Sequence, residues 1–230
     1  MFSYSSIAPD HDGTCGFSAP PRGLAPAALD GDPLAEGDGA GSGAADADRA
    51  TDLGSAFHRA AQYEAETGKV PDAARLEALC RTFCLGPDAA ARLASACGRW
   101  FGSGTCAETR AWELRRAEVP FFVPVGEAFM EGEIDLLCTR PGGAGALVVD
   151  YKTGGSDDEP LERLQKKHLL QAQCYAYALL SQGFASVELR FVRVERGDGA
   201  GQPQEVRYRF SQGDVERLEL LILAARAKTM

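Results

Sequence analysis

The spacing of the apolar residues changes near residue 118, and this change constrains the fold more than any other feature. Before it, the spacing is helical. Helices are expected at about 51–67, 72–84 and 88–101, with a short helix or strand at 110–117. After it, short apolar runs between turn residues predict strands at 119–125, 132–139 and 146–152, a helix over 160–182, strands at 187–195 and 205–210, and a helix over 214–228. The order α, βββ, α, ββ, α predicts an α/β domain.

The first 48 residues have a composition of their own. They are rich in Gly, Ala, Asp and Pro and carry no apolar period, so residues 1–48 are predicted to form a disordered linker or tail. The remainder, 49–230, is expected to be one domain, with a helical part at 49–117 and an α/β part at 118–230. A chain of 230 residues with 45% apolar content suffices for one sizeable core, and a second full domain is not expected.

The formal net charge of −9 argues at first against a nucleic-acid partner, because phosphate binding favours a basic surface. Most of this negative charge, however, lies in the first 50 residues. Residues 1–50 hold eight acidic residues and two arginines, so the other residues together carry a charge of about −3. Acidic residues gathered at one metal site would account for most of that remainder. The charge therefore does not exclude nucleic acid.

Several sequence classes can be set aside. No window approaches the 18 apolar residues that a membrane span needs, and the N-terminus has no signal-peptide pattern, so a cytoplasmic protein without membrane association is expected. The seven cysteines are odd in number and are not closely spaced as in disulfide-rich domains, so they are expected to be reduced thiols. A G-x-x-x-x-G-K-[ST] loop is absent, so this sequence does not encode a P-loop motor.

The strand VVDYKT carries the clearest chemical signal. Asp150 and Lys152 are two residues apart in a strand and therefore point to the same side of the sheet. Hairpin pairing with GEIDLL would place Asp135 beside Asp150, and two adjacent carboxylates repel each other unless a cation lies between them. Mg²⁺ or Mn²⁺ with oxygen ligands would remove that repulsion. A plain surface Asp–Lys pair explains D-x-K alone, but it leaves Asp135 unexplained in an apolar strand.

GEIDLL, followed fifteen residues after Asp135 by the aspartate of VVDYKT, resembles the PD-(D/E)XK nuclease superfamily, and within it the RecB-like branch at the C-terminal end of AddA and RecB helicase-nuclease subunits. LGSAFHRA at 53–60 is similar to the upstream His motif of that branch, AEVPF at 117–121 to its Glu-x-Pro-Phe segment, and QAQCYAYAL at 171–179 to its Gln-x3-Tyr motif. The resemblance implies a restriction-endonuclease-like core, with a central mixed sheet of about five strands flanked by helices and an N-terminal helical segment.

The resemblance also implies roles for the matching residues. His58, Asp135, Asp150 and the backbone carbonyl of Tyr151 would be the metal ligands, although a helix histidine packed at the edge of the core is the alternative for His58. Lys152 would hold the attacking water and stabilise charge on the transition state.

Three further groups complete the expected site. Glu118 would lie next to the ligands or bind the metal through water, and an exposed acid at the start of a strand is its alternative. Gln171 and Tyr175 are spaced i, i+4 on one helix face and would reach the DNA or the metal site. Arg163, Lys166 and Lys167 would contact DNA phosphates, although a solvated helix face explains these three cations equally well.

The function implied is a Mg²⁺- or Mn²⁺-dependent deoxyribonuclease, with an exonuclease as the favoured type, acting in double-strand-break repair on single-stranded DNA or duplex ends. A helicase subunit or fused helicase domain would be its partner, with an AddB-like protein as a further one. Only Cys174 follows Lys152, so the iron–sulfur cluster of some RecB-like nucleases is not expected. The alternative is a nuclease-like module that grips DNA with little or no cleavage.

Overall fold

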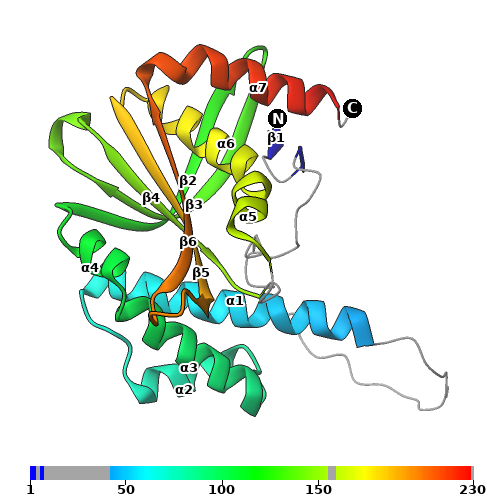
Figure 1. Cartoon of the computed structure of the whole chain (residues 1–230), viewed down its shortest axis with the longest axis vertical. Coiled ribbons are helices and arrows are strands. Elements are labelled where there is room, and N and C mark those ends of the chain that lie inside the picture. Colours follow the sequence, from blue (N-terminus) through cyan, green and yellow to red (C-terminus); the bar gives the residue numbers. More distant parts are fainter. Residues whose placement is uncertain (4–5, 8–41, 155–158, 229–230) are drawn as a thin grey trace, which may run out of the picture.

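The computed structural model describes residues 1–3, 6–7, 42–154 and 159–228, with the side chains of the first helix described from Asp52 onwards. A single sheet lies between two helical layers (Figure 1). The helices are α1 Ser42–Thr67, α2 Ala73–Thr82, α3 Pro87–Phe101, α4 Gly104–Arg110, α5 Leu161–Lys167, α6 Leu169–Leu180 and α7 Val215–Ala227. The strands are β1 Phe2–Ser3, β2 Leu114–Val125, β3 Ala128–Thr139, β4 Ala146–Lys152, β5 Ser186–Gly197 and β6 Pro203–Ser211.

The sheet is mixed and has six strands. β2 and β3 form a hairpin, and β2 pairs along one edge of β3 over nearly its whole length. β1 and β4 both pair with the other edge of β3, β1 near its start and β4 near its end. β5 lies parallel to β4, and β6 is antiparallel to β5. The predicted α/β class, with a mixed central sheet flanked by helices, is therefore confirmed.

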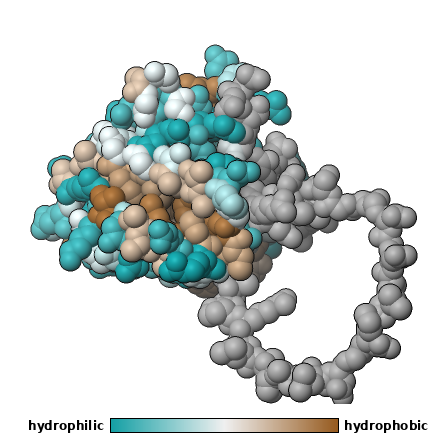
Figure 2. All heavy atoms as spheres, turned by 90° about the horizontal axis from the view of Figure 1, so that it is seen from below, coloured by the Kyte–Doolittle hydropathy of each residue, from teal (hydrophilic) through white to brown (hydrophobic). Residues whose placement is uncertain are grey.

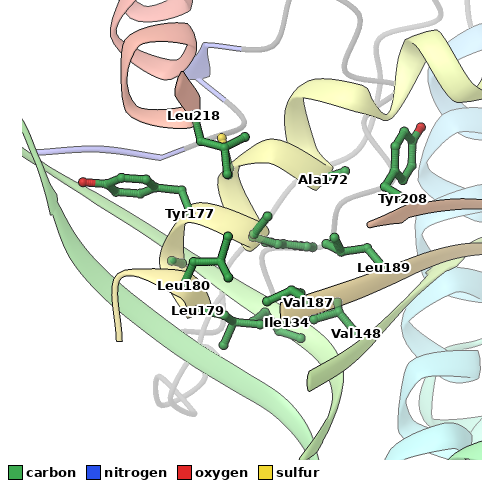
Figure 3. Packing of buried hydrophobic residues seen from close by; sticks show 14 of the residues in the cluster. Ile134, Val148, Ala172, Tyr177, Leu179, Leu180, Val187, Leu189, Tyr208 and Leu218 are labelled. Atoms are coloured by element: carbon green, nitrogen blue, oxygen red, sulfur yellow. The ribbon is translucent and has the colours of Figure 1, made fainter. Parts of the chain in front are cut away.

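One face of the sheet is covered by α6 and α7. Ile134, Val148, Val187 and Leu189 project from the strands toward Ala172, Leu179 and Leu180 of α6, and Leu218 of α7 packs over that helix (Figure 3). Nine of the twelve residues of α6 are buried, because the helix passes between the sheet and α7. Truncating a buried leucine in such a core typically costs about 2–5 kcal/mol, so this packing fixes α6 firmly on the sheet.

The other face is covered mainly by α1 and α3. The buried apolar positions Leu53, Phe57 and Ala60 follow helical spacing along α1, and Phe57 and Ala60 pack with Trp100 of α3 on the side of Val149. α2 has no buried residue and lies outside this layer. Seen from below, the molecule has hydrophobic residues interspersed with hydrophilic ones across this side (Figure 2).

β3 changes the direction of its side chains between Ile134 and Leu136. Strict alternation would place both on one face, yet Ile134 belongs to the core under α6 and Leu136 to the core under α1. The opposite residue of β2, Glu118, has a φ of 50°, which is rare for a residue other than glycine. The sheet is therefore irregular at Asp135, and at this point side chains from both helical layers can approach one strand.

Several strands are a few residues longer than expected, as with β3, which begins at Ala128 and not at residue 132. Larger differences from the prediction occur in three places. The helix expected over 160–182 is divided into α5 and α6 at His168, whose ψ of 1° interrupts the helical geometry. α4 ends at Arg110, where the segment expected at 110–117 begins, and only residues 114–117 of that segment form the start of β2.

The third difference concerns the first 48 residues. α1 begins at Ser42, not near Thr51, and its first turns are rich in alanine, the best helix former. Phe2–Ser3 pairs with Met130 and Glu131 of β3. The rest of the stretch predicted as a disordered tail, residues 4–5 and 8–41, lies outside the described residues. Within the described parts of the chain, no helix combines the length and apolarity needed to cross a membrane.

Candidate active site

Asp135, Asp150 and Lys152 meet where β3 and β4 separate. Leu136 and Val149 are the last residue pair between these strands, and one step further the register brings Asp135 opposite Asp150. The backbone N–H of Tyr151 donates a hydrogen bond to Asp135 Oδ2 over 2.7 Å. Both carboxylates and the lysine therefore lie at the fork between the two strands, as the sequence predicts from strand alternation and hairpin pairing.

Gln171 of α6 holds the acidic and basic side chains of β4 together. Its Nε2 donates to Asp150 Oδ2 over 2.7 Å, and its Oε1 accepts from Lys152 Nζ over 3.1 Å. Nε2 also lies 2.8 Å from the hydroxyl of Tyr175, one helical turn further on. That hydroxyl can donate to the backbone carbonyl of Glu133 at 2.8 Å or to Asp150 Oδ2 at 3.2 Å. The four predicted residues thus form one buried polar network.

One oxygen in this network is incompletely satisfied. Asp150 Oδ1 lies 2.7 Å from Lys152 Nζ, but this contact lacks hydrogen-bond geometry, and the buried oxygen has no hydrogen-bond donor among the described residues. At this distance the two charges attract each other and form an ion pair. The lone pairs of Oδ1, however, accept no hydrogen bond and could bind a cation. Buried polar atoms without a hydrogen-bond partner are uncommon in folded proteins and are found where an ion or a ligand binds.

α1 brings His58 to the two strands. Its Nδ1 lies 3.4 Å from Glu118 Oε1 and its Nε2 3.7 Å from Asp135 Oδ2. Burial by itself lowers the pKa of this imidazole, but the neighbouring carboxylates of Asp135 and Glu118 outweigh burial and raise the pKa of His58 to about 9. Gly54 permits this approach, because a Cβ at that position would lie 3.0 Å from Thr153 Oγ1 at the end of β4.

The carboxyl groups around His58 show the same crowding. Burial raises the pKa of Asp135 above its usual range, and the charge of His58 opposes the rise. Burial, followed by the nearby Glu118 carboxylate, raises the pKa of Glu133. Glu118 itself stands opposite Asp135 in the hairpin register, and its left-handed backbone accompanies the turn of its side chain toward His58. Backbone strain of this kind is concentrated at functional sites.

An aromatic cluster supports the centre of the site. The Tyr151 ring packs edge-on against Phe57, His58 and Trp100, with ring centroids 5.3, 5.7 and 5.0 Å away. Such contacts fix the ring and, with it, the peptide whose N–H reaches Asp135. The side chain of Tyr151 thus has a packing role, and only its backbone lies at the fork.

Glu195 of β5 also belongs to this region, and the sequence analysis missed it. It accepts a hydrogen bond from the backbone N–H of Gly154 over 2.5 Å and pairs with Arg92 of α3 at 2.7 and 3.1 Å. Burial by itself raises the pKa of Glu195, but the hydrogen bonds from Arg92 and from the Gly154 N–H, together with the charge of Arg92 and of a second arginine, lower the pKa below its usual value. Glu195 therefore holds the backbone at Gly154, two residues after Lys152. The sequence indicates this residue only as an acid that follows the apolar run of β5.

The three cations predicted to contact DNA lie on α5, the helix that precedes Gln171. The Arg163 side chain is 79% exposed and lies 3.7 Å from the carboxylate of Glu159, which is mostly covered. Lys166 is exposed and Lys167 partly so. The structure thus places these side chains at the surface next to the site and outside the buried network of Asp150.

The types of ligand atom at this site suit a divalent cation. His58 offers an imidazole nitrogen, Asp135 and Asp150 offer buried carboxylates, and Asp150 Oδ1 lacks a hydrogen-bond donor. The set is not preformed, however, because no three His, Cys, Asp or Glu side chains among the described residues stand as a ready ligand group. Asp150 instead turns toward Lys152 and Gln171, so metal binding would require its carboxylate to reorient.

A sequence model of the PD-(D/E)XK nuclease superfamily matches residues 34–228, which is most of the chain. The chain belongs to this superfamily. Asp150-Tyr151-Lys152 fits the (D/E)XK pattern in the superfamily name, and Asp135 is the earlier aspartate on which the resemblance in the sequence rests. The structure places these residues at the fork between β3 and β4.

Three solved structures resemble the chain at low sequence identity. A protein provisionally called an exonuclease, from Eubacterium rectale, is 10% identical with a TM-score of 0.47, and the match covers 79% of this chain and 69% of that protein. SSO0001 is 18% identical with a TM-score of 0.31, covering 76% and 74%. VC1899 from Vibrio cholerae is 12% identical with a TM-score of 0.28, covering 78% and 52%. No curated protein matches the sequence significantly.

Proposed function

We propose that the chain is a Mg²⁺- or Mn²⁺-dependent nuclease that hydrolyses phosphodiester bonds of DNA, with exonuclease activity, from the RecB-like branch of the superfamily. The observation that carries the proposal is the buried network of Asp150, Lys152 and Gln171 beside Asp135 and His58. An acid, a cation and an amide held together in the interior have little value for stability alone, because burying charge is costly.

His58, Asp135, Asp150 and the carbonyl oxygen of Tyr151 would hold the divalent ion. When bound, the ion supplies charge neutralisation at the scissile phosphate and lowers the pKa of its water. Glu118 would accept a hydrogen bond from His58 Nδ1–H, so that the lone pair of Nε2 faces Asp135 and the ion. Carboxylates commonly orient metal-binding histidines in this way.

Lys152 would orient the attacking water and stabilise the negative charge that develops on the phosphate. Its ammonium is suited to this role, because it is a compact charge held in a site that largely excludes solvent, with only 8% of the residue exposed. Gln171 Oε1 holds the ammonium at 3.1 Å, and Tyr175 in turn holds Gln171. These contacts limit how far Lys152 can move before substrate arrives.

The surface cations Arg163, Lys166 and Lys167 would contact the DNA backbone near the site. Single-stranded DNA or the end of a duplex is the proposed substrate, because an exonuclease site receives a chain terminus. The likeness of the His58, Glu118 and Gln171 segments to the RecB-like branch supports a partnership with a helicase subunit or fused helicase domain, and with an AddB-like protein. No iron–sulfur cluster is proposed.

The test is degradation of labelled DNA. Single-stranded and duplex DNA carrying a label at either end, with RNA of the same sequence for comparison, is incubated with the protein in Mg²⁺, Mn²⁺ or EDTA. Shortening of DNA from one end in either metal, stopped by EDTA, is the expected result. Cleavage that persists in excess chelator contradicts the metal mechanism.

A second candidate function is a module that binds DNA with little or no cleavage, and the absence of a preformed ligand group among the described residues favours it. In the same assay this module would shift DNA in a gel while leaving it intact at every metal concentration.

A further inference from the structure

Glu64 occupies a core position of α1. Leu53, Phe57 and Ala60 follow one another at spacings of four and three residues along the buried face, and the next position in that series is Glu64, which is only 3% exposed. An ionised carboxylate at a core position is unfavourable unless it is paired, and an apolar residue would simply have continued the series. The carboxylate therefore needs an explanation beyond packing.

Two arginines from two other elements meet this carboxylate. Arg110 at the end of α4 donates from Nε to Glu64 Oε1 over 2.8 Å. Arg115 of β2 donates from Nη1 to Oε2 over 3.0 Å and to Oε1 over 3.2 Å. A single buried side chain thus joins α1, α4 and β2. We call Glu64, Arg110 and Arg115 the α1 clamp.

The α1 clamp lies close to His58 and to its carboxylate partner Glu118 along the two elements that carry these residues. Glu64 follows His58 by six residues on the same helix, a distance of about 9 Å along the axis. Arg115 precedes Glu118 by three residues on β2. The clamp therefore fixes how α1 sits against β2, and this placement sets the 3.4 Å approach of His58 Nδ1 to Glu118 Oε1.

We propose that Glu64 is a positioning residue, which through Arg110 and Arg115 holds His58 against Glu118 and Asp135 in a geometry ready for a divalent cation. The inference rests on the proposed function, because it takes His58 as a metal ligand. A buried ion pair contributes little net stability compared with apolar packing, but it defines one geometry because its partners must meet at fixed distances and angles. The unusual backbone conformation of Glu118 limits how far this residue can move on β2. The position of α1 therefore determines the distance between His58 and Glu118.

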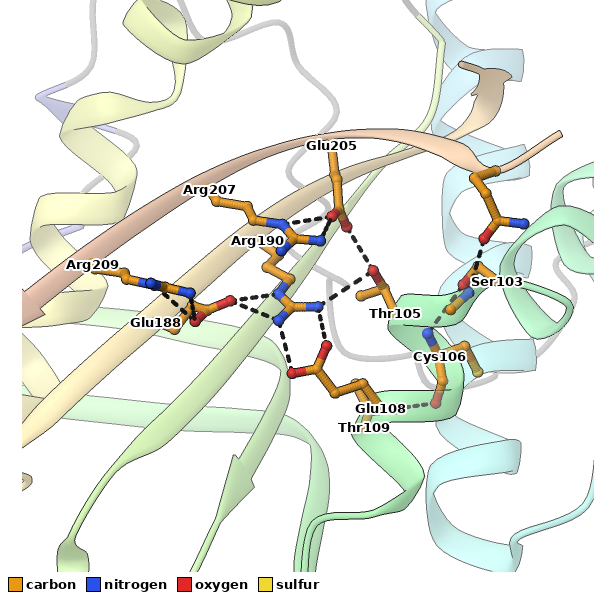
Figure 4. A network of polar contacts seen from close by, with 12 residues as sticks. Ser103, Thr105, Cys106, Glu108, Thr109, Glu188, Arg190, Glu205, Arg207 and Arg209 are labelled. Carbon is orange, nitrogen blue, oxygen red and sulfur yellow. Dashed lines mark hydrogen bonds and ion pairs between the residues drawn. The ribbon is translucent and has the colours of Figure 1, made fainter. Parts of the chain in front are cut away.

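The chain provides a matched control in a second buried charge network, which does not involve α1 (Figure 4). Arg190 of β5 is 3% exposed and donates to both oxygens of Glu108 of α4, over 2.7 and 2.9 Å, and to Glu188 over 2.8 Å. This network ties α4 to β5. It shares α4 with the α1 clamp, and among the described residues no hydrogen bond or ion pair joins it to α1, the helix that carries His58.

The experiment compares Glu64→Gln with Glu108→Gln in the full chain. Binding of Mn²⁺ alone is measured from the free Mn²⁺ signal in electron paramagnetic resonance, and the melting temperature is measured with and without Mn²⁺. Glu64→Gln is expected to weaken Mn²⁺ binding roughly 10-fold, at the low end for disturbed outer contacts of metal ligands, and to reduce the stabilisation by Mn²⁺. Glu108→Gln is expected to change the melting temperature without metal and to leave the Mn²⁺ affinity within about two-fold of wild type.

Wild-type Mn²⁺ affinity in Glu64→Gln overturns the inference, and so does an equal loss of affinity in both variants. If Glu64→Gln does not fold, Arg115→Lys replaces it, because lysine keeps the charge but loses the two contacts of the guanidinium with Glu64. The same loss of Mn²⁺ affinity is then expected, and wild-type affinity again overturns the inference. Absence of Mn²⁺ binding in wild-type protein overturns the proposed metal site itself, and the inference with it.

Discussion

Replacing Gln171 with leucine removes the link between α6 and the charged residues of β4. The amide is 6% exposed and makes two hydrogen bonds to charged groups, one to Asp150 and one from Lys152, together with a contact to the Tyr175 hydroxyl. Leucine has a similar volume but no polar atom. The substitution therefore leaves three buried polar groups with fewer partners and causes little change in packing.

The magnitude follows from these contacts. A hydrogen bond to a charged group contributes about 1.5–3 kcal/mol to stability. The full loss of two such bonds is not expected, because the ion pair between Asp150 and Lys152 and the hydrogen bond from Tyr175 to the Glu133 carbonyl remain. A loss of about 2–4 kcal/mol in the free energy of unfolding is expected, which lowers the melting temperature by about 4–16 °C in a chain of this size. Lys152 also loses its fixed position, and a displacement of about 1 Å near reacting atoms can reduce kcat about 100-fold.

Urea unfolding and single-turnover DNA cleavage measure the two effects. Gln173→Leu is the matched control, because Gln173 lies two residues along α6 and so points to another side of the helix. The control should keep its activity and change stability by less than about 1 kcal/mol. Equal effects of the two substitutions, or wild-type turnover in Gln171→Leu, would refute the role given to the network.

Three further predictions follow from single contacts. His58→Ala should raise the metal concentration needed for half-maximal cleavage roughly 10–100-fold; an unchanged metal titration with a lower melting temperature would mean that His58 only packs. Gly132→Ala should destabilise the protein by about 1–3 kcal/mol in urea unfolding, because the new Cβ would lie 2.5 Å from the Phe121 ring, whereas Gly98→Ala, which meets open space, should not. A chain starting at Ser42 should retain cleavage but melt at a lower temperature, since it lacks the pairing of β1 with β3 and the buried side chain of Ile7; equal melting temperatures would contradict this.

The sequence predicts the β-rich half of the fold well because its signals are local. Glycine and proline punctuate short apolar runs, and alternation within VVDYKT fixes which side chains share a face. α4 escaped prediction because seven residues are too few to show a helical period, although Ser103 caps it by accepting from Cys106 N. The division at His168 also escaped, because no proline or glycine marks it.

The candidate site is predictable to the extent that it depends on strand register and helix spacing. Asp135 and Asp150 lie one step beyond the last residue pair of a hairpin, and Gln171 and Tyr175 are one turn apart on a helix, so their proximity follows from local rules. The contact of Glu118 with His58 depends on an unusual backbone at Glu118, and no residue pattern announces it. Glu64 and Glu195 are held by arginines 46 to 103 residues away, and only the folded chain reveals such partners.

The measurement that tests the account most directly compares two variants of β4 in one set of preparations. Mn²⁺ binding and DNA cleavage are measured for wild type, Asp150→Asn and Lys152→Ala. Wild type should bind Mn²⁺ and cleave. Asp150→Asn should lose both properties, because it removes a proposed ligand, whereas Lys152→Ala should bind Mn²⁺ and fail to cleave, because its ammonium acts on the water and the developing charge. Cleavage at the wild-type rate by either variant would contradict the assignment of this site.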